Sequence, residues 1–143
     1  MSKIYYLFIT FFLLLSVSYA QDTAPRQIEI VYAGTLTIDN DKYPGATIFN
    51  SDEERKVQFR HQGMDIWCDV AVLYQKTNQV KAFGEVFIQQ GDSLKMNSEF
   101  IEYNGDTKVA IAKENVKLRN EKMTLETQEL FFDRNTQQAY YLN

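Results

Sequence analysis

Short runs of alternating apolar and polar residues fill most of the chain, and turn residues separate them. Residues 27–38 alternate in this way, and residues 57–143 contain further runs of the same kind. A period of two is typical of a β-strand with one buried face. Between these regions, residues 40–45 combine Asn, Asp, Pro and Gly and predict a turn, while the charged residues 51–56 predict a loop or a single helical turn.

The runs after residue 57 repeat with a spacing of about 29 residues. Apolar positions recur in three columns, which are Trp67, Met96 and Leu125; Val72, Ile101 and Leu130; and Tyr74, Tyr103 and Phe132. A polar column lies between them and contains Asp69, Ser98 and Thr127. A second apolar series runs through Val57 and Phe59, then Val86 and Ile88, then Val116 and Leu118, with spacings of 29 and 30 residues. Imperfect copies of one unit predict a repeat architecture.

Each unit is expected to contain one long strand and two shorter ones. In the first copy these are residues 64–74, 79–83 and 86–90. The apolar positions of the long strand change parity between Trp67 and Val72, which predicts a bulge or corner that leads one strand from one sheet to another. We therefore predict an almost all-β fold of folded-over strands, in which two facing sheets enclose an apolar interior.

The first twenty residues have the features of a cleaved export signal. Lys3 precedes a run of apolar residues at 4–15, and Ser18 and Ala20 provide small residues at the positions that signal peptidase reads. The apolar run is shorter than the roughly twenty residues that a membrane-spanning helix needs. We expect residues 1–20 to be removed and residues 21–143 to form one soluble exported domain.

Composition excludes several kinds of chemistry. The chain has one histidine, His61, and one cysteine, Cys68, too few for a zinc site of those residues or for an internal disulfide. Its formal net charge of −4 argues against nucleic acid as a partner. Among the carboxylates, Asp69 does not recur in its column, so no acid–base pair is repeated. We predict a protein that is not an enzyme and that needs no cofactor or metal ion.

Residues 61–94 resemble the signature stretch of the OstA-like N-terminal domain family. The matching positions are His61, Gly63, Cys68, Asp69, Ala71, Leu73, Tyr74, Asn78, Ala82, Phe83, Gly84, Val86, Ile88, Gln90, Gly91 and Asp92. The later turn at 104–108 and the ending at 139–141 also resemble the family, and the resemblance extends loosely back to residue 31. It is specific because it combines many spaced positions.

The resemblance implies an LptA-type fold, a folded-over β-jellyroll (β-taco) with two facing sheets. It also implies a periplasmic part in lipopolysaccharide transport to the outer membrane, with acyl chains held in an apolar groove and domains stacked by their edge strands. The groove candidates are the nine column residues Trp67, Val72, Tyr74, Met96, Ile101, Tyr103, Leu125, Leu130 and Phe132. Many family members are longer than this chain, which leaves open a short bridge component or a truncated one.

A second hypothesis stays open from the sequence. The columns also fit a closed core, and the protein would then be a structural β-repeat module that binds only other proteins of the cell envelope. Because the chain is acidic, attraction to an anionic headgroup does not drive lipid binding in this interpretation. Burial of acyl chains would do so, at roughly 25 cal/mol for each Å² of apolar surface.

Overall fold

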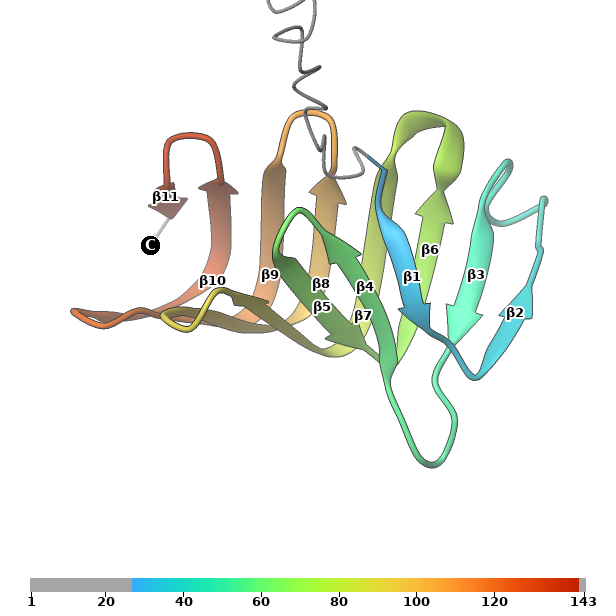
Figure 1. The fold of residues 1–143 in the computed structure, drawn as a ribbon, viewed down its shortest axis with the longest axis horizontal. Coiled ribbons are helices and arrows are strands. Elements are labelled where there is room, and N and C mark those ends of the chain that lie inside the picture. The colour runs from blue at the N-terminus through green and yellow to red at the C-terminus, as the bar shows by residue number, and fades with distance from the viewer. Residues whose placement is uncertain (1–26, 142–143) are drawn as a thin grey trace, which may run out of the picture.

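The computed structural model describes residues 27–141, and these residues are almost entirely β-strand (Figure 1). One three-residue 3₁₀ helix, Gln75–Thr77, interrupts the strands. The prediction of an all-β fold is therefore confirmed, while the proposed export signal lies outside the described residues. The strands are β1 Glu29–Tyr32, β2 Thr35–Thr37, β3 Thr47–Asn50, β4 Val57–His61, β5 Met64–Cys68, β6 Val70–Tyr74, β7 Gln79–Gln90, β8 Leu94–Asn104, β9 Val109–Arg119, β10 Thr124–Asp133 and β11 Gln138–Tyr141.

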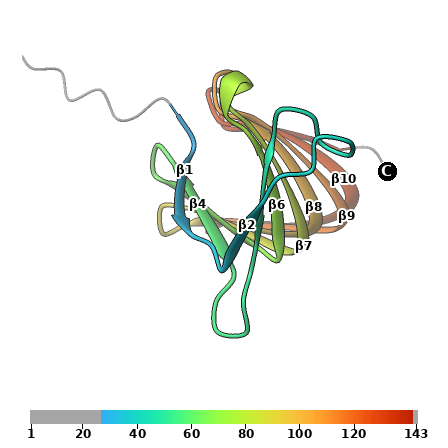
Figure 2. The ribbon, with the colours of Figure 1, turned by 90° about the vertical axis from the view of Figure 1, so that its right-hand side faces the viewer.

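All strand pairs are antiparallel and belong to one sheet that folds over on itself (Figure 2). The long strands β7 to β10 each cross the fold, so each contributes to both halves. We call half-sheet I the series β2, β3, β6, residues 79–83, 100–104, 109–113 and 129–133, and β11. Half-sheet II is the series β1, β4, β5 and residues 86–90, 94–97, 116–119 and 124–127.

The fold line, or crease, is made by breaks in the strand register. The pairing of β7 with β8 shifts between Phe83 and Val86, and Gly84 and Glu85 in this gap have φ angles of +79° and +42°. A side chain at Gly84 is also excluded sterically, because an added Cβ would lie 2.6 Å from Asp69 Oδ2. Positive φ is a conformation that glycine adopts at little cost. The crease therefore explains the glycine at this position.

Small hydroxyl residues stabilise the crease in the later copies. Ser98 Oγ donates a hydrogen bond to the Phe100 carbonyl at 3.1 Å, and Thr127 Oγ1 donates one to the Glu129 carbonyl at 3.3 Å. Each hydroxyl thus satisfies a carbonyl at a point where the ladder is disrupted. The polar column of the sequence is the chemistry of this bend.

In the first copy the corner is a complete break between two strands. β5 ends at Cys68 and β6 begins at Val70, with Asp69 between them. The backbone N–H of Asp69 is shared between the carbonyls of Phe83 and Gly84, both at 3.1 Å. Lys56 Nζ lies 2.6 Å from Asp69 Oδ1. The corner expected within residues 64–74 is therefore present, and an ion pair holds it against β7.

The repeat period changes by one residue along the chain. Inward positions of β6 and β8 are 30 residues apart, as Ala71 and Ile101 show, whereas Ile101 and Leu130 of β10 are 29 apart. The turn from β7 to β8 spans residues 91–93, while the turn from β9 to β10 spans residues 120–123. Different hairpin lengths therefore produce the two spacings.

Candidate functional site

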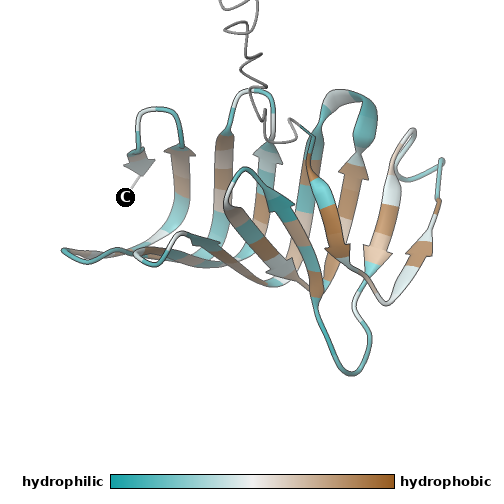
Figure 3. Ribbon diagram, in the orientation of Figure 1, coloured by the Kyte–Doolittle hydropathy of each residue, from teal (hydrophilic) through white to brown (hydrophobic). Residues whose placement is uncertain are grey.

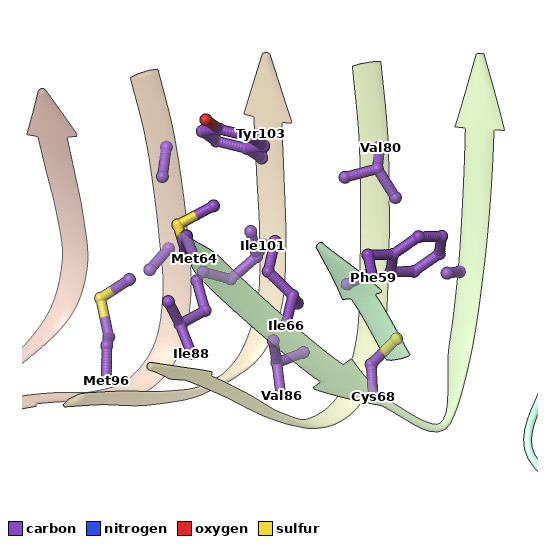
Figure 4. Packing of buried hydrophobic residues seen from close by; sticks show 14 of the residues in the cluster. Phe59, Met64, Ile66, Cys68, Val80, Val86, Ile88, Met96, Ile101 and Tyr103 are labelled. Carbon is purple, nitrogen blue, oxygen red and sulfur yellow. The ribbon is translucent and has the colours of Figure 1, made fainter. Parts of the chain in front are cut away.

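The apolar interior between the half-sheets is the candidate site (Figures 3 and 4). From half-sheet I, alanines alternate with large residues in a single row across five strands, which is Ala71, Ala82, Ile101, Ala112 and Leu130. The next row is Leu73, Val80, Tyr103, Ala110 and Phe132. All ten of these side chains are buried. Alternation of small and large residues leaves space for side chains from the opposite half-sheet.

Half-sheet II presents larger apolar side chains to the same interior. One row runs through Phe59, Ile66, Ile88, Met96, Leu118 and Leu125. A row nearer the crease runs through Val57, Cys68, Val86, Ser98 and Val116. All are buried except Leu125, which is partly exposed and packs against the cluster. The rows continue from β4 to β10, so the apolar interior extends along the axis of the fold.

Side chains fill this interior where it is described. Phe59 and Ile66 from half-sheet II are each 1% exposed, and Ile101 and Tyr103 from half-sheet I are 0% exposed. Figure 4 shows these side chains directed into the space between the half-sheets. An occupant of the interior must therefore displace side chains or move the half-sheets apart. Partial exposure of Leu125 shows that the packing is looser toward β10.

Six of the nine sequence-predicted groove residues lie in these interior rows. They are Met96, Ile101, Tyr103, Leu125, Leu130 and Phe132. The other three, Trp67, Val72 and Tyr74, lie on the outer face, which corrects the sequence prediction. The interior positions are instead Ile66, Ala71 and Leu73, each one residue earlier. A constant spacing of 29 residues assigned the first copy to the wrong parity, and alternate residues of a strand face opposite ways.

The outer position of Trp67 has its own surroundings. Trp67 stacks on Phe87 with ring centroids 5.5 Å apart, and the two rings line a shallow hollow together with Arg55, Lys56 and Gln58. Arg55 in turn lies over the ring of Tyr32, at 4.0 Å from its centroid. These contacts account for the only tryptophan of the chain without a place for it in the interior.

Polar groups gather at the mouth, the side of the fold opposite the crease. Arg134, in the turn from β10 to β11, donates hydrogen bonds from Nε to Gln90 Oε1 at 2.8 Å and from Nη2 to the Gln62 carbonyl at 2.9 Å. Its Nη1 donates to the Tyr103 hydroxyl at 2.8 Å and to the His61 carbonyl at 3.3 Å. Gln62, His61 and Gln90 lie at turns of half-sheet II, so one guanidinium links the two half-sheets.

The same cluster includes the buried ring of His61. Its Nδ1 is 2.8 Å from the Tyr103 hydroxyl, which also accepts the hydrogen bond from Arg134. Burial raises the pKa of Tyr103, and the positive charge of Arg134 opposes this rise. Tyr103 therefore stays protonated and joins the apolar interior to the polar mouth. Sequence analysis treated residue 134 only as part of a turn, because no local pattern reveals a partner that lies 72 residues away.

The cysteine is not placed for nucleophilic chemistry. Cys68 is 0% exposed, and burial raises the pKa of its thiol to about 12, with the nearby charge of Asp69 acting in the same direction. A thiol must ionise to act as a nucleophile or a metal ligand. Residues 27–141 also contain no group of three or more His, Cys, Asp or Glu side chains that could hold a metal ion. The absence of enzymatic activity stays a prediction.

The sequence matches the family of OstA-like proteins over residues 26–143. The chain belongs to this family. Among solved structures, the OstA-like chain is similar to LptH from Pseudomonas aeruginosa, described as the LptA homologous periplasmic component of the conserved lipopolysaccharide transport device. The identity is 19%, the TM-score is 0.65, and the match covers 80% of each chain, so the two share a fold.

No curated protein sequence matches the OstA-like chain. Within residues 27–141, none of the structure is a helix with the length and hydropathy needed to cross a bilayer. The family match confirms the resemblance that residues 61–94 indicated.

Proposed function

We propose that this protein is a periplasmic component of a lipopolysaccharide transport bridge and that it carries acyl chains in the interior between its half-sheets. The observation that carries the proposal is the apolar interior that runs from β4 to β10 in a chain of the OstA-like family. The printed role of LptH, which has the same fold, supports the choice of lipopolysaccharide as cargo. A closed structural module without a lipid ligand is the alternative that the experiment must separate.

Acyl chains would take the place of side chains that now meet across the interior. The alanine positions of half-sheet I are suited to this, because Ala82 and Ala112 on either side of Ile101 leave a narrow path once the half-sheets part. Half-sheet II would contribute Ile88, Met96 and Leu118 to the same path. Methionine is unbranched and adapts its shape to irregular partners.

The test compares two isoleucine variants of one chemical type. Ile101→Ser changes the interior, and Ile111→Ser changes the outer face of the neighbouring strand, where Ile111 is paired with Glu102. Exported protein is purified, extracted and analysed for acylated lipid by mass spectrometry. We expect wild type and Ile111→Ser to retain lipid and folded Ile101→Ser to lose most of it. Full retention by folded Ile101→Ser would show that the interior is only a core, and lipid-free wild type would favour the structural module.

The proposal includes assembly by edge strands. At one end β2 of half-sheet I has only β3 as a neighbour, and Leu36 in it is 59% exposed. At the other end β11 pairs only with β10, and Tyr141 is 48% exposed. An edge strand with free backbone groups is a template for adding a strand of another domain. Because the two edges differ, the contact would be head to tail and would form short rods.

Two measurements check the assembly and the location. Sedimentation velocity over a concentration series is expected to show a mass that grows with concentration, and Leu36→Pro is expected to reduce this growth because proline removes an edge donor. A constant monomer mass at every concentration would exclude self-stacking. Sequencing of the exported protein is expected to begin at Gln21, and a product that retains Lys3 would exclude cleavage after Ala20.

A further inference from the structure

The guanidinium of Arg134 lies at the mouth of an apolar interior without a carboxylate partner. Its hydrogen-bond acceptors are the carbonyls of His61 and Gln62, the side-chain amide of Gln90 and the hydroxyl of Tyr103, all of them neutral. None of the ion pairs within residues 27–141 includes it. In an acidic chain with 19 carboxylates, a half-buried arginine without such a partner is a notable exception.

The neighbouring acid does not compensate for this charge directly. The carboxylate of Asp133 accepts hydrogen bonds from the backbone N–H of Asn135 at 2.8 Å and from its side-chain amide at 3.1 Å. These bonds lower the pKa of Asp133 and keep its carboxylate at the turn. A charge that is partly removed from water is costly unless it is paired. The site is therefore favourable for an anion.

The position of Arg134 connects that anion to the interior. Its Nη1 touches the hydroxyl of Tyr103, and the ring of Tyr103 is fully buried in the same row as Phe132. A ligand that bound at the guanidinium would thus have the interior rows directly beneath its charged end. This arrangement suits an amphiphile, with an anionic group at the mouth and an apolar chain inside.

Opening of the fold frees the groups that an anion needs. The bonds from Arg134 to the turn at His61 and Gln62 cross between the half-sheets, so parting the half-sheets for a chain breaks them. The freed N–H groups then require new acceptors. A phosphate group presents several strong acceptors in a geometry that guanidinium matches with two parallel hydrogen bonds.

We propose that Arg134 binds the anionic headgroup, a phosphate or phosphate ester, of an acylated ligand whose chain occupies the interior. The inference rests on the proposed lipid carriage and adds the chemistry that selects the ligand. It also changes the expectation from net charge, because a local cation at the mouth attracts an anionic headgroup although the chain as a whole is acidic.

The experiment uses two probes with the same chain and different headgroups. Dodecyl phosphate and dodecyl maltoside are titrated into the protein by calorimetry below their micelle concentrations. Arg134→Gln removes the guanidinium, and the control Lys42→Gln makes the same change of charge in the loop between β2 and β3. Circular dichroism verifies that each variant is folded, and Arg134→Lys keeps the charge if Arg134→Gln does not fold.

We expect wild type and Lys42→Gln to bind dodecyl phosphate at least about tenfold more tightly than dodecyl maltoside. In Arg134→Gln this preference is expected to disappear, with little change in maltoside binding, and Arg134→Lys is expected to keep part of it. A preference that persists in Arg134→Gln would overturn the assignment. So would displacement of dodecyl phosphate by an equal concentration of inorganic phosphate, because the site would then recognise a free anion.

Failure of the two proposals gives different results. If wild type binds both probes equally well, lipid carriage stands and the role of Arg134 is wrong. If wild type binds neither probe, lipid carriage itself fails, and the headgroup site fails with it.

Discussion

Replacement of Ile66 by alanine tests which face of β5 is interior. Ile66 is 1% exposed and is paired with Phe59 of β4 and Ile88 of β7 in the interior row of half-sheet II. The change removes three carbon groups, worth about 2.4 kcal/mol at about 0.8 kcal/mol each. The cavity left behind adds to this loss, so the total should be about 3 to 4 kcal/mol.

The matched control is the next residue but one position away in facing, Trp67, which lies on the outer face of the same strand. Trp67→Phe keeps an aromatic ring against Phe87 and should cost less than about 1 kcal/mol. Both variants are measured by urea unfolding followed by circular dichroism. A loss below about 1 kcal/mol for Ile66→Ala, or a larger loss for Trp67→Phe than for Ile66→Ala, would refute the assigned parity.

The remaining predictions concern Trp67 and Cys68. Because Trp67 is partly exposed on the outer face, acrylamide should quench its fluorescence in the folded protein, and dodecyl phosphate should not protect it; strong protection would place it in the interior. Cys68 should react with a thiol reagent at about pH 8 only after unfolding. Its pKa is raised from 9.0 to about 12, so its contribution to stability is complete below pH 9 and is lost as the pH rises toward 12. Cys68→Ala should lack this loss, and identical alkaline unfolding of both proteins would contradict it.

Sequence reasoning predicted the architecture because strand periodicity and turns are local properties. The series through Phe59, Ile88 and Leu118 was assigned to one face, and the strand register confirms that these residues share a row. The error in the first copy came from matching Tyr74 with Tyr103 by residue type. Leu73 is the true equivalent of Tyr103, because the hairpin between β7 and β8 lengthens the first period by one residue.

The mouth could not be predicted in the same way. Arg134 belongs to a turn that resembles any other polar turn, and its acceptors at His61 and Gln62 are remote in sequence. Only the closure of the fold brings these groups together. The column of Ser98 and Thr127 was visible as a pattern, but its role in satisfying carbonyls at the crease depends on the bend itself.

The order of strand pairing has a consequence for how the chain folds. From β7 to β11 each strand pairs with the next, so hairpin after hairpin can form through short loops. The pairs β1 with β4 and β3 with β6 instead join segments that are separated along the chain. Local pairings form faster than remote ones. We expect the hairpin array to nucleate and extend as a repeat does, and the amino-terminal strands to be added last, as a slower and separately observable kinetic phase.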